Sequence, residues 1–209
     1  MIKINKRDEP DAWTQKKGTQ GFTKYEPITA LRDALLAEQG YICAYCMREI
    51  PVKDKGVSEM SKIEHVKSRT DRPDLQLDYN NVVICCPGYI NADDHCDKLK
   101  SGNSVTFSLL NDIFPDTISY STKNGTIKSS NKVWKKEMND LLNLNNAMLA
   151  ANRMNTLDGV HQVLEKKKWR KAKLQEKLEE WSNPDAEGKL KPYCGIVIWY
   201  LKKKLIQQP

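Results

Sequence analysis

The spacing of apolar residues changes several times along the chain. Residues 1–27 are polar and interrupted by glycine and proline, which predicts an extended arm with little regular structure. Apolar residues then recur at spacings of three and four from Leu31 on, between Thr29 and Gly40, which predicts one helix. Between residues 41 and about 100, helical spacing is scarce and Cys, His, Asp and Asn are frequent. This middle part has too few apolar residues to hold itself together by packing alone.

The second half of the chain first alternates and then becomes helical. Two runs of alternating apolar and polar residues flank Asn124-Gly125, a dipeptide typical of two-residue hairpin turns. From Val133 on, apolar residues recur with helical spacing. We expect a hairpin and then helices near residues 133–142, 145–166, 168–182 and 193–206.

Composition excludes a membrane protein. Hydrophobic residues make up 39% of the 209 positions, the mean hydropathy is −0.66, and no apolar run approaches the roughly 20 residues of a membrane span. The first residues also lack the apolar stretch of a signal peptide, so we expect a cytoplasmic protein. In that reducing compartment, the six cysteines are expected to be metal ligands or buried thiols rather than disulfides.

Positive charge is concentrated toward the end of the chain. The formal net charge is +7, yet residues 1–130 hold 18 basic and 18 acidic side chains, whereas residues 131–209 hold 16 and 9. Such an excess favours a polyanionic partner, nucleic acid first, although a solvated helix face or a contact with another protein would give the same pattern. The candidate nucleic-acid contacts are Lys166, Lys167, Lys168 and Arg170.

Four cysteines have the spacing of a zinc site. Cys43 and Cys46 form a C-x-x-C pair, and Cys86 and Cys96 follow 40 and 50 residues after Cys46. Four thiolates suit tetrahedral Zn²⁺, which would tie together segments that are poor in apolar residues. A redox C-x-x-C site is the alternative, but no βαβ pattern surrounds the pair and the further cysteines would be unexplained. Cys85 could replace Cys86 as a ligand.

Polar residues of catalytic type accompany these cysteines. In chain order they are Glu64, His65, Asn81, Asp97 and Lys100. In this order, between the cysteine pairs, they resemble the motif of the HNH endonucleases of the ββα-metal type. The resemblance implies an α+β fold, with a zinc-stabilised ββα-metal nuclease module and a mostly helical C-terminal extension. Its register makes Cys86, rather than Cys85, the zinc ligand.

The resemblance also assigns roles to these side chains. His65 would be the general base, because a histidine that is neutral near pH 7 can take a proton from water. Glu64 and Asp97 would hold one divalent cation, Mg²⁺ or Mn²⁺, because oxygen ligands favour hard metals. Asn81 would orient the histidine through hydrogen bonds to its loop, and Lys100 would contact a phosphate or remain solvated.

Some positions depart from the family pattern. Glu64 stands where aspartate is more usual, and Asp97 stands where histidine or asparagine is more usual. The loop between Cys86 and Cys96 is also longer than the usual two-residue gap. His95 could therefore be the last metal ligand in place of Asp97.

Segments outside the motif resemble one HNH subfamily of bacterial defence. They include Met1-Ile-Lys-Ile4, Gly40-Tyr-Ile-Cys-Ala-Tyr-Cys46, Ala151-Asn-Arg153 and Tyr193-Cys-Gly-Ile-Val-Ile-Trp-Tyr-Leu201. That subfamily is the nuclease half of Septu-type and retron-associated antiphage systems. The resemblance implies an ABC-type ATPase partner, in some systems with a retron reverse transcriptase and its non-coding RNA/DNA. The chain has no G-x-x-x-x-G-K-[ST] loop, so nucleotide sensing would belong to the partner.

These observations predict three parts. Residues 1–40 would be an arm and a helix that pack on the module, residues 41–105 the nuclease module with structural zinc, and residues 106–209 a hairpin and a basic helical extension. The expected function is metal-dependent hydrolysis of phosphodiester bonds in DNA or RNA as an antiphage effector. The alternatives are a zinc-dependent nucleic-acid binder without catalysis and an adaptor that docks the ATPase through its helices.

Overall fold

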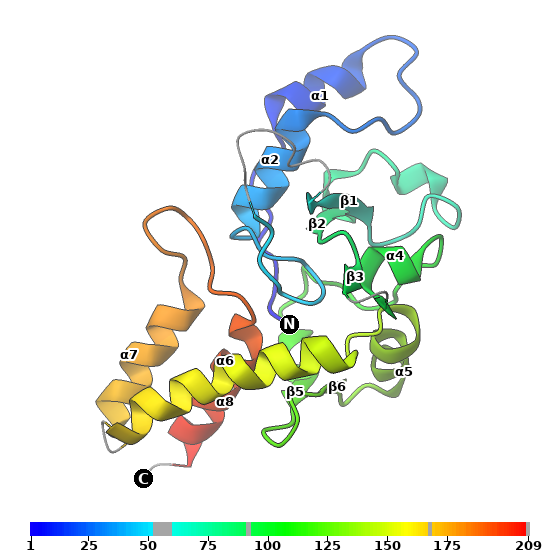
Figure 1. The fold of residues 1–209 in the computed structure, drawn as a ribbon. Helices are drawn as coiled ribbons and strands as arrows, with labels where there is room; N and C mark the ends of the chain where they lie inside the picture. The colour runs from blue at the N-terminus through cyan, green and yellow to red at the C-terminus, as the bar shows by residue number, and fades with distance from the viewer. Residues whose placement is uncertain (52–59, 91–92, 167–168, 208–209) are drawn as a thin grey trace.

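Short strands and helices share the chain in an α+β fold, which confirms the expected class (Figure 1). The computed structural model describes residues 1–51, 60–90, 93–166 and 169–207. Its first half contains α1 (Asp11–Gly18), α2 (Thr29–Glu38), β1 (Lys62–His65), η1 (Pro73–Leu75), η2 (Tyr79–Asn81), β2 (Val82–Cys85), β3 (Tyr89–Ile90), β4 (Asp93–Asp94) and α4 (Cys96–Lys100). Its second half contains η3 (Pro115–Thr117), β5 (Ile118–Tyr120), β6 (Ile127–Ser129), α5 (Lys132–Lys136), η4 (Glu137–Leu141), α6 (Ala147–Lys166), α7 (Lys171–Ser182) and α8 (Cys194–Ile206).

The N-terminal arm is more ordered than its polar sequence predicts. The expectation of little regular structure before Pro27 is wrong, because α1 forms within the arm. On this helix only Trp13 is buried, and its ring meets those of Phe22 and Tyr25 with each pair of centroids 6.0 Å apart. A single anchoring side chain leaves no apolar period along a helix, so residue spacing could not reveal it.

Helix α2 forms as predicted, and its end is fixed to strand β2. Gly40 follows it with a φ of +61°, at a point where a Cβ atom would lie 2.6 Å from the Leu190 side chain. Only glycine fits there. The neighbouring Gln39 amide accepts a hydrogen bond from the backbone N–H of Ile84 at 2.8 Å and donates one to the Ile84 carbonyl at 2.9 Å. Strand β2 is thereby held against the end of α2.

Strands β1 and β2 form an antiparallel pair that carries two of the predicted catalytic residues. Glu64 pairs with Val83, and His65 pairs with Val82. All four residues of β2 are buried, in keeping with their apolar run. Helix α4 lies against β1, since the Lys100 ammonium donates a hydrogen bond to the His65 carbonyl at 3.0 Å.

The hairpin and the C-terminal helices lie where the sequence pattern predicts them. β5 and β6 pair with Tyr120 opposite Ile127. The turn is longer than the two residues expected, because Ser121 N–H bonds to the Thr126 carbonyl at 2.8 Å, outside the Asn-Gly dipeptide. The segment expected as one helix near 133–142 is α5 followed by the wider π-helical turn η4. Helices α6, α7 and α8 match their predicted ranges within about three residues.

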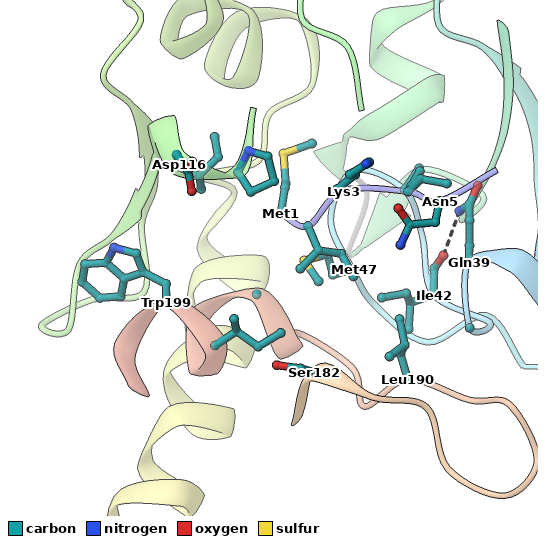
Figure 2. A pocket seen from close by; sticks show the side chains of 18 of the residues that line it. Met1, Lys3, Asn5, Gln39, Ile42, Met47, Asp116, Ser182, Leu190 and Trp199 are labelled. Atoms are coloured by element: carbon teal, nitrogen blue, oxygen red, sulfur yellow. Dashed lines mark hydrogen bonds between the residues drawn. The ribbon is translucent and has the colours of Figure 1, made fainter. Parts of the chain in front are cut away.

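Apolar side chains from all three predicted parts form one buried cluster within the described chain. A cavity of about 750 Å³ remains beside it, between the first residues, the end of α2 and α8 (Figure 2). Met1, Met47, Leu190 and Trp199 are among its lining residues. No helix in the described ranges combines the length and the apolar character that crossing a bilayer requires.

Candidate metal centre and active site

Four buried cysteines converge from three segments of the chain. All four Sγ atoms, of Cys43, Cys46, Cys86 and Cys96, lie within 4.8 Å of one another. The Sγ atoms of Cys43 and Cys96 are 3.8 Å apart, and those of Cys46 and Cys86 are 3.7 Å apart. Sulfurs at about 2.3 Å from a tetrahedral zinc ion are about 3.8 Å from one another. The donor set and its spacing therefore fit zinc, which confirms the predicted four-cysteine cluster as a site that could hold such a metal.

The backbone around these cysteines forms the turns that a tetrahedral site needs. Cys43 N–H bonds to the Arg48 carbonyl at 2.9 Å, and Met47 N–H bonds to the Cys43 carbonyl at 3.0 Å. Met47 has a φ of +64°, which closes the turn that contains the first two thiols. Cys96 N–H reaches the Leu142 carbonyl at 2.9 Å, so the fourth thiol is anchored from the helical half of the chain.

The two residues that the sequence offers as alternative metal ligands also lie beside this cluster. Cys85 is fully buried and shares a hydrogen bond with Cys43, but it lies outside the set of four converging sulfurs. His95 is fully buried as well, and its Nδ1 lies 3.2 Å from the Sγ of Cys96 and 3.9 Å from that of Cys86. His95 therefore faces the thiols.

A smaller cavity of about 430 Å³ opens beside the β1–β2 sheet. Glu64 and His65 of β1 line it together with Asp97 and Lys100 of α4 and with Arg69 from the loop after β1. The structure thus brings together the predicted base and both predicted carboxylates. None of these five side chains lines the larger cavity of Figure 2.

The imidazole of His65 is held in one orientation. Its Nε2 lies 3.0 Å from the Gln76 carbonyl oxygen. A carbonyl only accepts hydrogen bonds, so Nε2 carries the proton and Nδ1 keeps the basic lone pair. Burial lowers the pKa of His65 below its usual value, so the ring is neutral near pH 7.

Asn81 holds the loop that follows this histidine. Its Oδ1 accepts a hydrogen bond from Lys67 N–H at 2.8 Å, and its Nδ2 donates to the carbonyls of Lys67 at 2.9 Å and Leu75 at 3.1 Å. The asparagine side chain does not line the pocket. Its predicted orienting role would therefore act through the backbone on either side of the pocket.

Glu64 is buried beside one cation and a second carboxylate. Its Oε1 lies 2.5 Å from the Lys100 ammonium and accepts a hydrogen bond from the Tyr45 hydroxyl at 3.2 Å. Burial raises the pKa of Glu64, and a hydrogen bond shared with Asp97 adds to the rise, whereas Lys100 opposes it. Two converging carboxylates are oxygen donors of the kind that Mg²⁺ or Mn²⁺ prefers. Besides the four cysteines, the described residues contain no other close group of three or more metal-ligating side chains. A cation in this pocket would therefore have two side-chain ligands, Glu64 and Asp97.

Lys100 lies inside the protein rather than at its surface. Its side chain is 1% exposed, and its ammonium is engaged by Glu64 and by the His65 carbonyl. Lysine is rarely buried in this way unless it is paired, so residue type alone favoured an exposed phosphate contact. The phosphate contact stays a prediction, while the observed contacts make Lys100 the counter-charge of Glu64.

Replacing Lys100 with methionine is expected to lower the free energy of unfolding by about 3 kcal/mol, because it leaves the Glu64 carboxyl buried without its counter-charge. Urea denaturation measures the change. Adding Glu64→Gln to the same chain should recover part of the loss, since no orphan charge then remains.

The matched control is Lys98→Met on the same helix. Lys98 forms a half-exposed ion pair with Asp94 at 2.8 Å, so its loss should cost less than about 1 kcal/mol. An equal decrease in the free energy of unfolding for Lys98→Met and Lys100→Met would show that the buried ion pair contributes no more to stability than the exposed one.

Arg69 is a cation of the pocket that the sequence did not single out. It is exposed, and its guanidinium carbon lies 5.3 Å from the centre of the Tyr25 ring. It forms no ion pair with any carboxylate in the described part of the chain. No local pattern marks this residue, because only the folding of the loop after β1 brings it to the pocket.

The predicted basic contacts lie elsewhere in the molecule. Lys166 ends α6 and Arg170 precedes α7, and both side chains are exposed. Lys167 and Lys168 lie outside the described residues. In Figure 1 the end of α6 and the start of α7 lie at the end of the molecule away from β1, β2 and α4. The structure does not bring Lys166 and Arg170 to the pocket.

Neither protein-family models nor curated proteins give a match to this chain.

Proposed function

We propose that this chain is a metal-dependent endonuclease of the HNH type that hydrolyses phosphodiester bonds in nucleic acid. The observation that carries the proposal is the pocket that Glu64, His65 and Asp97 line together. Residues of β1 and of the short helix α4 line this pocket, β1 pairs with β2, and Cys96 of the four-cysteine cluster directly precedes Asp97. A strand pair, a short helix and a metal-binding cluster are the parts expected of a ββα-metal module.

His65 would act as the general base. With the proton held on Nε2 by Gln76, Nδ1 can accept a proton from the water that attacks phosphorus. Glu64 and Asp97 would hold a divalent cation whose charge offsets that on the phosphate and on the leaving 3′ oxygen. Arg69 would contact the phosphate, since a guanidinium without an ion-pair partner suits phosphate oxygens.

The cysteine cluster would have a structural role. Cys96 directly precedes Asp97 at the start of α4, and Cys86 follows the end of β2. A zinc ion on the four thiols would join α4 to the sheet and fix the position of the Asp97 backbone. The geometry of the pocket would then depend on the metal centre next to it.

The sequence resemblance extends the proposal to the biological role. The chain would be a cytoplasmic effector of antiphage defence that works with an ABC-type ATPase. The exposed Lys166 and Arg170 would hold flanking nucleic acid or an acidic surface of that partner, because they lie far from the pocket.

The direct test uses the purified zinc-loaded chain with Mg²⁺ or Mn²⁺ and end-labelled double-stranded DNA, single-stranded DNA and RNA. We expect cleavage of at least one substrate and its loss when EDTA is added. Binding without cleavage of any substrate would instead support the zinc-dependent nucleic-acid binder.

The cleavage rate should stay high at mildly acidic pH. His65 must be neutral to accept a proton, and burial lowers its pKa below the usual 6.5, so the rate should fall only as pH drops through that lower value. Single-turnover rates measured across the pH range give the pH at which the rate is half its maximum. Repeating them at two saturating Mg²⁺ concentrations distinguishes protonation of His65 from loss of the bound cation. A midpoint clearly above 6.5 would contradict the assignment of His65 as the base.

A further inference from the structure

The segment between α1 and α2 covers one side of the His65 ring. Tyr25, from this segment, lies with its ring centre 4.5 Å from that of His65 and at 87° to it. Such perpendicular contacts are a favoured geometry for aromatic pairs. The sequence pattern predicts little regular structure for this polar arm. One of its residues nevertheless contacts the predicted general base.

Gln76 ties the same segment to the histidine. Its backbone carbonyl accepts the hydrogen bond from His65 Nε2 at 3.0 Å. Its side chain accepts a hydrogen bond from Tyr25 N–H at 3.1 Å and donates one to the Thr23 carbonyl at 3.2 Å. One residue thus holds both the histidine and the arm that covers it.

The ring of Tyr25, rather than its hydroxyl, makes these contacts. The hydroxyl oxygen is buried and has no hydrogen-bond partner among the described residues. The ring instead packs on Trp13, with centroids 6.0 Å apart, and lies beneath the Arg69 guanidinium at 5.3 Å. Trp13 is fully buried, so the ring is supported from the core.

We propose that Tyr25 is a positioning residue for His65, with Gln76 as the clamp that fixes Tyr25 in place. This inference rests on the proposed nuclease function. Without the Tyr25 ring, the imidazole is free to turn away from the Gln76 carbonyl, so its hydrogen bond to that carbonyl forms for only part of the time. A base that spends less time in the reactive orientation lowers kcat, whereas substrate binding by other side chains is little affected.

The test compares Tyr25→Leu, Tyr25→Phe and Phe22→Leu. Phe22 belongs to the same arm and packs on Trp13, but it is not in contact with His65, so it controls for loosening of the arm. We expect Tyr25→Leu to lower kcat about tenfold or more with KM changed less than about threefold, Tyr25→Phe to keep wild-type kcat, and Phe22→Leu to keep it too. Thermal unfolding of each variant reports how far the arm is destabilised.

Nitrogen-15 spectra of the imidazoles give a readout that needs no catalysis. The wild type and Tyr25→Phe should show one fixed His65 tautomer with the proton on Nε2, and Tyr25→Leu should show averaging of the two nitrogens. Equal kcat for Tyr25→Leu and Phe22→Leu, or a fixed tautomer in Tyr25→Leu, would overturn the positioning role while leaving the nuclease proposal intact. A wild type with the fixed tautomer and no cleavage of any substrate would overturn the nuclease proposal itself, and with it the proposal that Tyr25 positions a catalytic base.

Discussion

Cys96→Ala is expected to lose the bound zinc and to remove the cooperative unfolding transition of the chain. Structural zinc sites contribute apparent free energies of about 10–16 kcal/mol, which is comparable with the whole stability of a domain, about 5–15 kcal/mol. The change also detaches α4 from the turn that contains Cys43, since the two Sγ atoms lie only 3.8 Å apart. Metal analysis gives the zinc content, and circular dichroism with and without a chelator gives the transition.

Cys85→Ala is the matched control, because Cys85 is equally buried and contacts the same cluster. It should keep one zinc per chain and lose only the small packing contribution of a thiol, about 1–2 kcal/mol. Zinc retained in Cys96→Ala and lost in Cys85→Ala would mean that the fourth ligand has been misassigned.

Residue spacing predicts the elements that bury a regular apolar stripe. Leu31 and Leu35 of α2 and Leu157 and Leu164 of α6 are fully buried, and each pair repeats at a helical interval. For that reason α2 and the C-terminal helices lie close to their predicted ranges. The hairpin was predictable from Asn124-Gly125, although the turn itself is longer.

The arm and its contacts could not be predicted in this way. Helix α1 contributes one buried side chain, Trp13, and a single residue has no period. Tyr25, Gln76 and Arg69 belong to connecting segments, so only tertiary folding brings them to His65. Residue type and spacing do not predict which loop residues come close to His65 in the folded chain.

The sequence predicts which residues form the site better than it predicts how their side chains are arranged. Thiol spacing pointed to four cysteines, but Cys85 and Cys86 are neighbours, and only the positions of their sulfurs separate one from the other. Lys100 has the same residue type as the exposed lysines, yet the packing of α4 on β1 buries it against Glu64. The burial of Lys100 depends on an ion pair with a residue that is distant in the sequence.

His65→Ala should abolish nearly all cleavage while leaving the fold intact. General-base catalysis contributes about 10²–10⁴-fold to the rate, and alanine has no nitrogen that can take the proton. His65 is buried at the edge of a pocket rather than in the apolar cluster, so zinc content should be unchanged and the melting temperature should fall by only a few degrees.

His161→Ala provides the matched control. The His161 ring is half-buried, and it packs on Trp169 and Tyr200 at ring distances of 5.7 Å and 4.6 Å, away from the pocket. The His161→Ala variant removes a histidine that also packs on aromatic rings but lies outside the pocket, so it should cleave at the wild-type rate.

The single-turnover rate of Mg²⁺-dependent cleavage, measured side by side for the wild type, His65→Ala and His161→Ala, tests the proposed nuclease function most directly. The predicted result is cleavage by the wild type and His161→Ala, with His65→Ala slower by at least about a hundredfold at equal zinc content. Equal rates for the wild type and His65→Ala would contradict it.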